Sequence, residues 1–292
     1  MYQALLERLG LVESKKKAFP PSTRMPYLGV MFDTIEMTKS ILPERVKDLD
    51  VELDRFIEGK NCNRKEMESL MGKLFFVSSC VTSSRVFTCR LMSFLRSFPN
   101  RKTHLKIPAA AKQDARWWRK FIHDWNGVSL ILDKSWSNID EIVASDASLM
   151  AGGAYTEDAY FSVEFPERFS DSPIHVKEFI TLLIAIKLWG EKWSKKRILI
   201  HCDNQNVVHS INNQNPKNDE LQDCLRELIY WESLFSFKIG AVYIETKANH
   251  LADFLSRSTS SSDHLNYFKN INIAPKKRIS VPTALFDLKN DW

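Results

Sequence analysis

The chain has 292 residues, of which 44% are hydrophobic, and a formal net charge of +5. This size allows two domains with real cores, and the lack of any apolar run of about eighteen residues argues against a membrane span. The N-terminus lacks the basic and apolar segments of a secretory signal, and the five cysteines form no Cys-x-x-Cys pair. We therefore expect reduced thiols, no structural zinc site, and an intracellular location in the cytoplasm or nucleus.

The first part of the chain is predicted to be mostly helical. Pro43 favours the first turn of a helix, where its missing N–H costs little, and that helix should end at Gly59. The segment Asn63-Arg-Lys-Glu66 has the capping-box pattern of another helix start. The expected helices cover residues 2–9, 43–57, 63–75, 84–97 and 109–126, with a strand pair around 27–32 and 36–39.

Charge is unevenly distributed along the sequence. Residues 60–120 contain fourteen lysines or arginines against three acids, whereas residues 141–257 contain twelve basic and seventeen acidic residues. Basic side chains often only solvate helix faces, but this imbalance slightly favours binding of a nucleic-acid backbone. Near its end, Trp117, Phe121 and Trp125 have i, i+4, i+8 spacing, which is more typical of a core than of a base-stacking platform.

The second part of the chain alternates between strand and helix patterns. The expected strands cover 141–146, 152–156, 160–165, 197–203 and 237–244, and the expected helices 174–189, 204–213, 219–234 and a last one from Ala248. This order predicts a mixed five-stranded sheet with flanking helices, so the whole chain is of the α+β or α/β class. The boundary is expected near 133–138. Residues 258–263 have linker composition, ahead of a loosely ordered tail.

Four carboxylates in this second part are candidate functional groups: Asp146, Glu178, Asp203 and Asp253. Glu178 lies on the same helical stripe as the apolar Leu182 and Ala185. Acids at strand ends or on the buried side of a helix are costly unless a positive charge joins them. Hard divalent cations prefer such oxygen ligands, and a pair of them can promote phosphodiester cleavage.

Each acid also has an interpretation without chemistry. Asp203 could cap the helix that follows it, and Asp146 could stabilise a turn. Glu178 could pair with Lys177 or Lys187, and the last acid could simply face solvent. For any one acid alone, the structural role is favoured over metal binding. The four acids taken together and in this order favour a shared metal site.

The order of the four acids resembles the ribonuclease H active site. The motifs around them look like those of DIRS-type and gypsy-type retroelement reverse transcriptases: Asp146-Ala-Ser, Gly152-Gly-Ala, Lys177-Glu178, Cys202-Asp203-Asn204 and Asn249-x-x-Ala-Asp253-x-Leu-Ser-Arg257. In the first part, Tyr27-Leu-Gly-Val resembles a primer-grip hairpin, and Ser69-Leu-Met-Gly-Lys73 and Arg116-Trp-Trp resemble the thumb and connection.

The resemblance covers roughly residues 1–257 and implies four parts. These are an end-of-palm and primer-grip hairpin (1–43), a helical thumb and connection (44–133), a ribonuclease H-like domain (134–257), and a linker with C-terminal tail (258–292).

Three features depart from the family pattern or stand outside it. Tyr243 occupies the place of a histidine ten residues before the last acid, and a phenol with a pKa near ~10 cannot shuttle protons in the same way. His250 could substitute, although a plain surface histidine is the favoured interpretation. The chain contains no Asp-Asp dipeptide of a polymerase palm, so we expect no polymerase activity from it alone. Lys276-Lys-Arg278 resembles a nuclear import signal, but such triplets are common by chance.

The resemblance implies a metal-dependent endonuclease that hydrolyses the RNA strand of RNA–DNA hybrids. All four acids would be catalytic and would hold two Mg²⁺ ions, or Mn²⁺ in their place, about 4 Å apart. Besides the hybrid, the rest of a Pol polyprotein is a conceivable partner, and no membrane is expected. The alternative is a non-catalytic nucleic-acid-binding relic or domesticated module of the same origin. The residues expected to contact the hybrid are Asn204, Lys73, Arg116, Arg119 and Lys120. The Asn204 amide can reach a 2′-hydroxyl.

Overall fold

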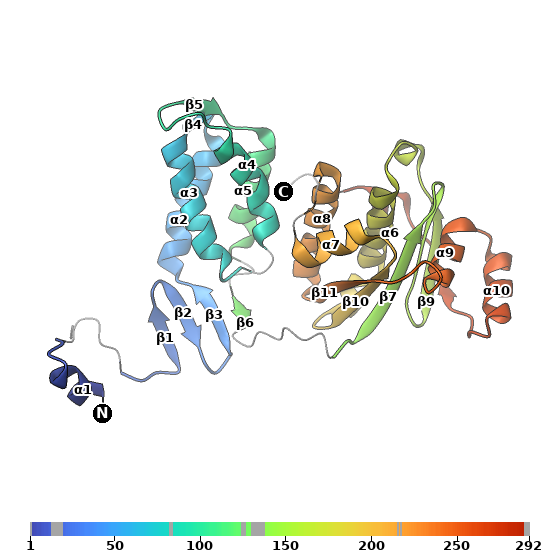
Figure 1. Ribbon diagram of the computed structural model, residues 1–292, viewed down its shortest axis with the longest axis horizontal. Coiled ribbons are helices and arrows are strands. Elements are labelled where there is room, and N and C mark those ends of the chain that lie inside the picture. The colour runs from blue at the N-terminus through green and yellow to red at the C-terminus, as the bar shows by residue number, and fades with distance from the viewer. Residues whose placement is uncertain are drawn as a thin grey trace.

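Two folding units follow one another in the structure (Figure 1). The computed structural model describes residues 2–12, 20–81, 84–123, 127–129, 138–214, 216 and 218–288. A helical unit with a small antiparallel sheet comes first, and a six-stranded mixed sheet with helices follows. The short helix predicted at the start is α1 (Tyr2–Arg8). Within these described ranges, no helix is long and apolar enough to cross a membrane.

The small sheet differs from the predicted strand pair. It consists, in order, of β1 (Arg24–Tyr27), β2 (Val30–Asp33), β3 (Thr38–Ile41) and β6 (Val128–Ser129). The segment 27–32, predicted as one strand, instead contains a turn at Leu28 and Gly29, whose φ angles are 50° and 85°. Glycine adopts positive φ without strain, so a reversal is possible inside an otherwise apolar run.

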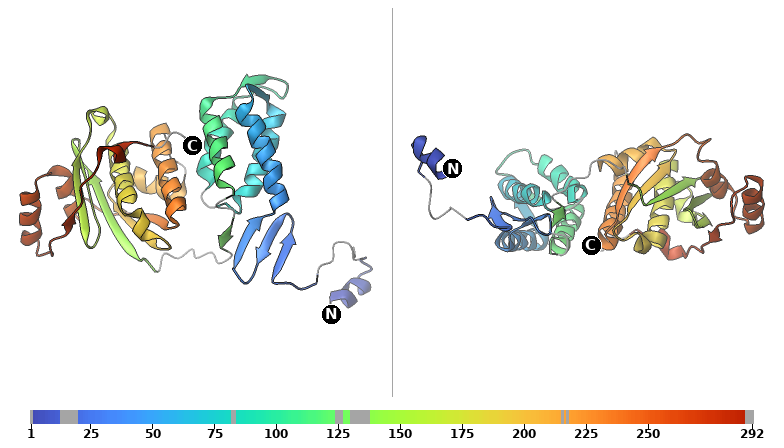
Figure 2. Two further views of the ribbon diagram at one scale, coloured as in Figure 1. Left: turned by 180° about the vertical axis from the view of Figure 1, so that it is seen from behind. Right: turned by 90° about the horizontal axis from the view of Figure 1, so that it is seen from below.

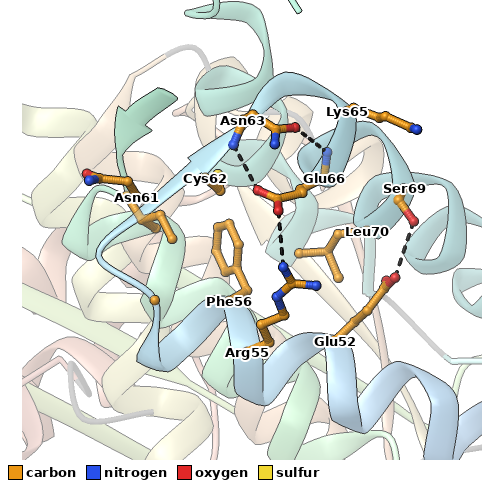
Figure 3. A pocket seen from close by; sticks show the side chains of 12 residues that line it. Glu52, Arg55, Phe56, Asn61, Cys62, Asn63, Lys65, Glu66, Ser69 and Leu70 are labelled. Atoms are coloured by element: carbon orange, nitrogen blue, oxygen red, sulfur yellow. Dashed lines mark hydrogen bonds and ion pairs between the residues drawn. The ribbon is translucent and has the colours of Figure 1, made fainter. Parts of the chain in front are cut away.

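The helices of the first unit begin largely where local signals predict. They are α2 (Pro43–Glu58), α3 (Arg64–Ser78), α4 (Cys89–Arg96) and α5 (Ala109–Phe121), with a 3₁₀ turn, η1 (Ser84–Thr88), and a short pair, β4 (Asn61–Asn63) and β5 (His104–Lys106). The capping box is confirmed, because the Asn63 side chain accepts from the Glu66 N–H and the Glu66 carboxylate accepts from the Asn63 N–H (Figure 3). Arg55 donates to the same carboxylate at 3.2 Å. The helix predicted over 84–97 opens as the 3₁₀ turn rather than as α-helix.

Two of the three aromatics in the predicted stripe belong to the core. Trp117 is fully buried, Phe121 nearly so, and the Trp117 ring stacks on Phe87 with centroids 3.8 Å apart. The core interpretation is therefore confirmed for these two. Trp125 lies outside the described residues.

The second unit contains the predicted mixed sheet with one additional strand. Its strands are β7 (Glu141–Ala147), β8 (Ala151–Tyr155), β9 (Ala159–Glu164), β10 (Arg197–Cys202), β11 (Lys238–Tyr243) and β12 (Lys277–Arg278), in the order β11-β10-β7-β8-β9-β12. β7, β8 and β9 are antiparallel, whereas β10 is parallel to β7 and β11. The helices are α6 (Ile174–Trp189), α7 (Gln205–Asn213), α8 (Asp219–Phe235) and α9 (His250–Arg257). The proposed boundary lies almost wholly within 130–137, outside the described residues.

The loosely ordered tail predicted after the linker segment 258–263 is wrong. Residues Ser261–Asn270 form α10, and β12 pairs with the edge strand β9. Phe286 is buried against Phe165 and Phe169. The few apolar residues of this segment suffice to order it because they meet apolar positions far away in the sequence. The Lys276-Lys-Arg triplet runs into β12.

Candidate active site

Asp146 lies on the central strand β7 and is only 6% exposed. The Ser256 hydroxyl of α9 donates to its Oδ2 at 2.6 Å. Burial raises the pKa of this carboxyl to about 6, although the Ser256 hydrogen bond opposes the rise. The turn interpretation is wrong for Asp146, which is paired within the strand opposite Gly153.

Gly153 allows α9 to approach the sheet closely enough to reach Asp146. A Cβ at this position would lie 2.5 Å from the Leu255 Cβ and 2.8 Å from the Ser256 nitrogen. No larger residue fits between β8 and α9 without displacing the helix. The glycine of the Gly-Gly-Ala motif thus places the Ser256 hydroxyl on the carboxylate.

Glu178 is the second buried acid, on α6, and is 7% exposed. The Asn204 amide donates to its Oε1 at 3.2 Å, and the Cys202 thiol lies 3.6 Å from Oε2. Burial raises the pKa of Glu178 to about 7; the negative charges of Asp203 and Asp146 add to this rise. Burial also raises the pKa of the Cys202 thiol, which keeps it protonated as a hydrogen-bond donor.

Neither lysine expected as an alternative partner pairs with Glu178. The fully buried Lys177 Nζ donates to the carbonyls of Leu149 at 2.7 Å and Ser170 at 3.1 Å. Lys187 instead forms an ion pair with Glu227 at 3.0 Å. The surface-pair interpretation of Glu178 is therefore wrong.

Asp203 does not cap α7, because that role belongs to its neighbour. The Asn204 side-chain oxygen accepts from the N–H groups of Asn206 and Val207. Asp203 itself, directly after β10, accepts from the Thr246 hydroxyl at 2.8 Å. Both ends of the Asn204 amide are engaged inside the protein, so its expected contact with RNA would need one of these bonds to open.

Asp253, in the first turn of α9, faces partly outward. Arg257 donates to its Oδ1 at 2.7 Å, as an i, i+4 pair. Its charge nevertheless acts on Asp146, as does that of Asp203. The four acids thus occupy one region of the unit, with Asp253 at its outer side.

Three of the side chains in this region have potential ligand atoms within 4.8 Å of one another: Glu178, Cys202 and Asp203. Carboxylate oxygens suit a hard divalent cation such as Mg²⁺ or Mn²⁺. Within the described part of the chain, Asp146 and Glu178 form no ion pair with a lysine or arginine, so a cation would meet two uncompensated carboxyls. The residues present therefore fit the metal that the resemblance implies.

The basic residues expected on the hybrid divide into two groups. Arg119 pairs with Asp54 at 2.8 Å and with Asp50 at 3.5 Å, and Lys73 pairs with Glu52 at 3.0 Å. All three acids belong to α2, which has six acidic and three basic residues and lies outside the segment 60–120. The exposed Arg116 and Lys120 form no ion pair among the described residues, so they remain the better candidates for phosphate contact.

Ser256 and Thr246 take part in the site but were not expected to from sequence alone. Ser256 lies three residues after Asp253, and i, i+3 spacing places both on one face of a helix; that was the available signal. Thr246 gave no local signal. His250 lies beside Tyr267, with Nδ1 3.1 Å from the phenolic oxygen, and Tyr243 is exposed on β11.

The mixed sheet with flanking helices has the architecture that the resemblance to ribonuclease H implies, and comparisons with known proteins support the resemblance. Residues 170–259 match a family described as reverse transcriptase-like. The matched segment contains three of the four acids. The enzymatic polyprotein of Carnation etched ring virus is 23% identical over 273 residues, covering 87% of this chain and 37% of the polyprotein. The chain thus spans little more than a third of that relative's length. These matches confirm the resemblance to retroelement reverse transcriptases.

Solved structures with detectable similarity are more distant. The foamy viral protease–reverse transcriptase dRH, in complex with double-stranded DNA, is 15% identical with a TM-score of 0.37, covering 82% of this chain and 41% of that one. Ribonuclease H1 from Halobacterium salinarum is 16% identical with a TM-score of 0.34, covering 41% of this chain and 96% of its own.

Proposed function

We propose that this chain contains a metal-dependent endonuclease that hydrolyses the RNA strand of RNA–DNA hybrids. Asp146, Glu178 and Asp203 would hold Mg²⁺, with Asp253 completing the ligand set. The observation that carries the proposal is the pair of buried carboxyls, Asp146 and Glu178, each raised in pKa by burial and by the charge of Asp203 and neither with a basic partner among the described residues. Burying such groups is costly for a protein that gains nothing from them.

The chain's own residues prepare this site for a cation. The hydrogen bonds from Ser256 to Asp146 and from Asn204 to Glu178 favour the charged carboxylates. The raised pKa values of both acids mean that binding a cation would release protons. Bound Mg²⁺ would supply the positive charge that lowers the pKa of an attacking water and stabilises the leaving 3′ oxygen.

The helical unit would contribute the grip on the duplex. Arg116 and Lys120 are exposed on α5, where they can meet phosphates without first breaking an internal ion pair. The polyprotein match further supports the rest of a Pol polyprotein as a partner.

The test is cleavage of a labelled RNA strand in a hybrid, with and without Mg²⁺. Asp146→Asn keeps the shape but removes a ligand charge, so cleavage should be abolished while hybrid binding is kept. Single-stranded RNA and duplex DNA serve as control substrates. Undiminished cleavage by Asp146→Asn refutes the site, and equal cleavage of duplex DNA refutes the substrate. Binding of hybrid without any Mg²⁺ binding would identify a non-catalytic nucleic-acid-binding relic.

A further inference from the structure

A buried ion pair joins the helical unit to the ribonuclease H-like unit. Arg226 of α8 is 1% exposed and forms an ion pair with Asp114 of α5, which is wholly buried. The Arg226 guanidinium also lies over the Phe87 ring, 4.9 Å from its centroid. Both charges are thus buried where the two units meet.

Further contacts between the same elements surround this pair. Arg90 of α4 pairs with Asp223 of α8 and donates to Gln113 at 3.0 Å. The rings of Phe121 and Tyr230 meet edge to face, with centroids 5.7 Å apart. Polar and apolar contacts therefore both favour one relative placement of α8 against α4 and α5. The ribbon views place α8 on the side of the second unit that faces these helices (Figures 1 and 2).

The physical chemistry of the pair makes this placement specific. A buried charge that loses its partner strongly destabilises a protein, so sliding α8 along α5 is disfavoured. α8 also packs against α6, the helix that carries Glu178. The interface is thereby connected to the candidate site through two packed helices.

We propose that Asp114 and Arg226 are positioning residues that fix the helical unit relative to the carboxylates. If the proposed function holds, a duplex held along α5 reaches the carboxylates at one defined distance from its contact with α5. The cut would then fall at a fixed spacing from a hybrid end, and losing the ion pair would spread the cuts over several positions.

The arrangement itself is measured without any nuclease activity. Spin labels on cysteines placed at Lys102 and Glu191, one exposed position in each unit, report the distance between the units. Cys89→Ser removes the one cysteine that is not buried. The parent protein should give a single narrow distance peak, and Asp114→Asn should lose it. Asp223→Asn breaks the outer, more exposed pair and should broaden the peak less.

The matched control is Lys187→Met, which breaks an equally buried ion pair, with Glu227, inside the second unit. It should lower stability but leave the distance peak unchanged. A narrow peak in Asp114→Asn, or equal broadening by Lys187→Met, overturns the proposal.

Cut positions on a hybrid with one fixed end form the second measurement. Asp114→Asn should spread the cuts while its rate on a short hybrid stays near that of the parent; an unspread pattern overturns the fixed spacing. If the parent cuts nothing, the proposed function fails, while the distance measurement still decides whether the pair fixes the two units.

Discussion

Replacing Glu178 by glutamine should stabilise the protein when no divalent cation is bound. Burial raises the pKa of this carboxyl from 4.5 to about 7, which corresponds to roughly 3 kcal/mol at about 1.4 kcal/mol per pH unit. Because the folded pKa lies above the unfolded one, the parent loses stability as pH rises from about 4.5 through about 7. Glutamine has no charge to bury, so Glu178→Gln avoids this loss.

The assay is urea unfolding at about pH 8 in the presence of a chelator, repeated at about pH 5. At the higher pH, Glu178→Gln should be more stable than the parent by up to roughly 3 kcal/mol, and at the lower pH the difference should shrink. Mg²⁺ at 100 times its Kd should stabilise the parent by about 2.7 kcal/mol. The variant, with a weakened ligand set, should gain much less.

Glu227 provides the matched control, since it is also a buried glutamate but is paired with Lys187. Glu227→Gln leaves a buried lysine without its counter-charge and should destabilise the protein at both pH values. If Glu178→Gln were also destabilising at about pH 8 without cation, the uncompensated charge at the site would be refuted.

Three further outcomes are expected. Ser256→Ala should raise the pKa of Asp146 and move the midpoint of Mg²⁺ binding, followed by calorimetry, to higher pH. The control Ser162→Ala, which removes a serine hydrogen bond to a backbone carbonyl, should not move that midpoint. Equal pH dependence of Mg²⁺ binding in Ser256→Ala and the parent would contradict the role of Ser256. Charge reversal at Arg116 and Lys120 should weaken hybrid binding and reduce its salt dependence in a filter-binding titration, and an unchanged salt slope would argue against this surface. The purified chain should not extend a primer, and templated incorporation of a labelled nucleotide would disprove that expectation.

Local signals predicted most helix starts and the main strands. Pro43 begins α2, Asn63 caps α3, and the apolar stripe around Glu178 gives α6 with its predicted limits. These features depend on residues within one or two turns of each other, so the sequence contains them directly. The burial of Glu178 was also predictable, because its i+4 and i+7 neighbours are apolar.

Long-range contacts were not predictable in this way. The excess of basic residues over 60–120 slightly favoured nucleic-acid binding by this segment, yet acids of α2 pair with Lys73 of α3 and Arg119 of α5. The tail was expected to be loose because its apolar residues are sparse, but Phe286 finds its partners more than a hundred positions earlier. Such pairings depend on the fold as a whole, and no local pattern specifies them.

Three basic side chains that could neutralise the inner carboxylates form other contacts instead. Lys177, next to Glu178 in sequence, is held by two backbone carbonyls, and Lys187 is held by a glutamate of α8. Arg257 donates to Asp253, at the outer side of the site, rather than to Asp146. A protein that needed only to stabilise its buried acids would pair them with these side chains, since an unpaired buried charge is costly. Keeping them apart leaves the two inner carboxylates available to a cation from outside, which is the property that a metal-dependent hydrolase requires.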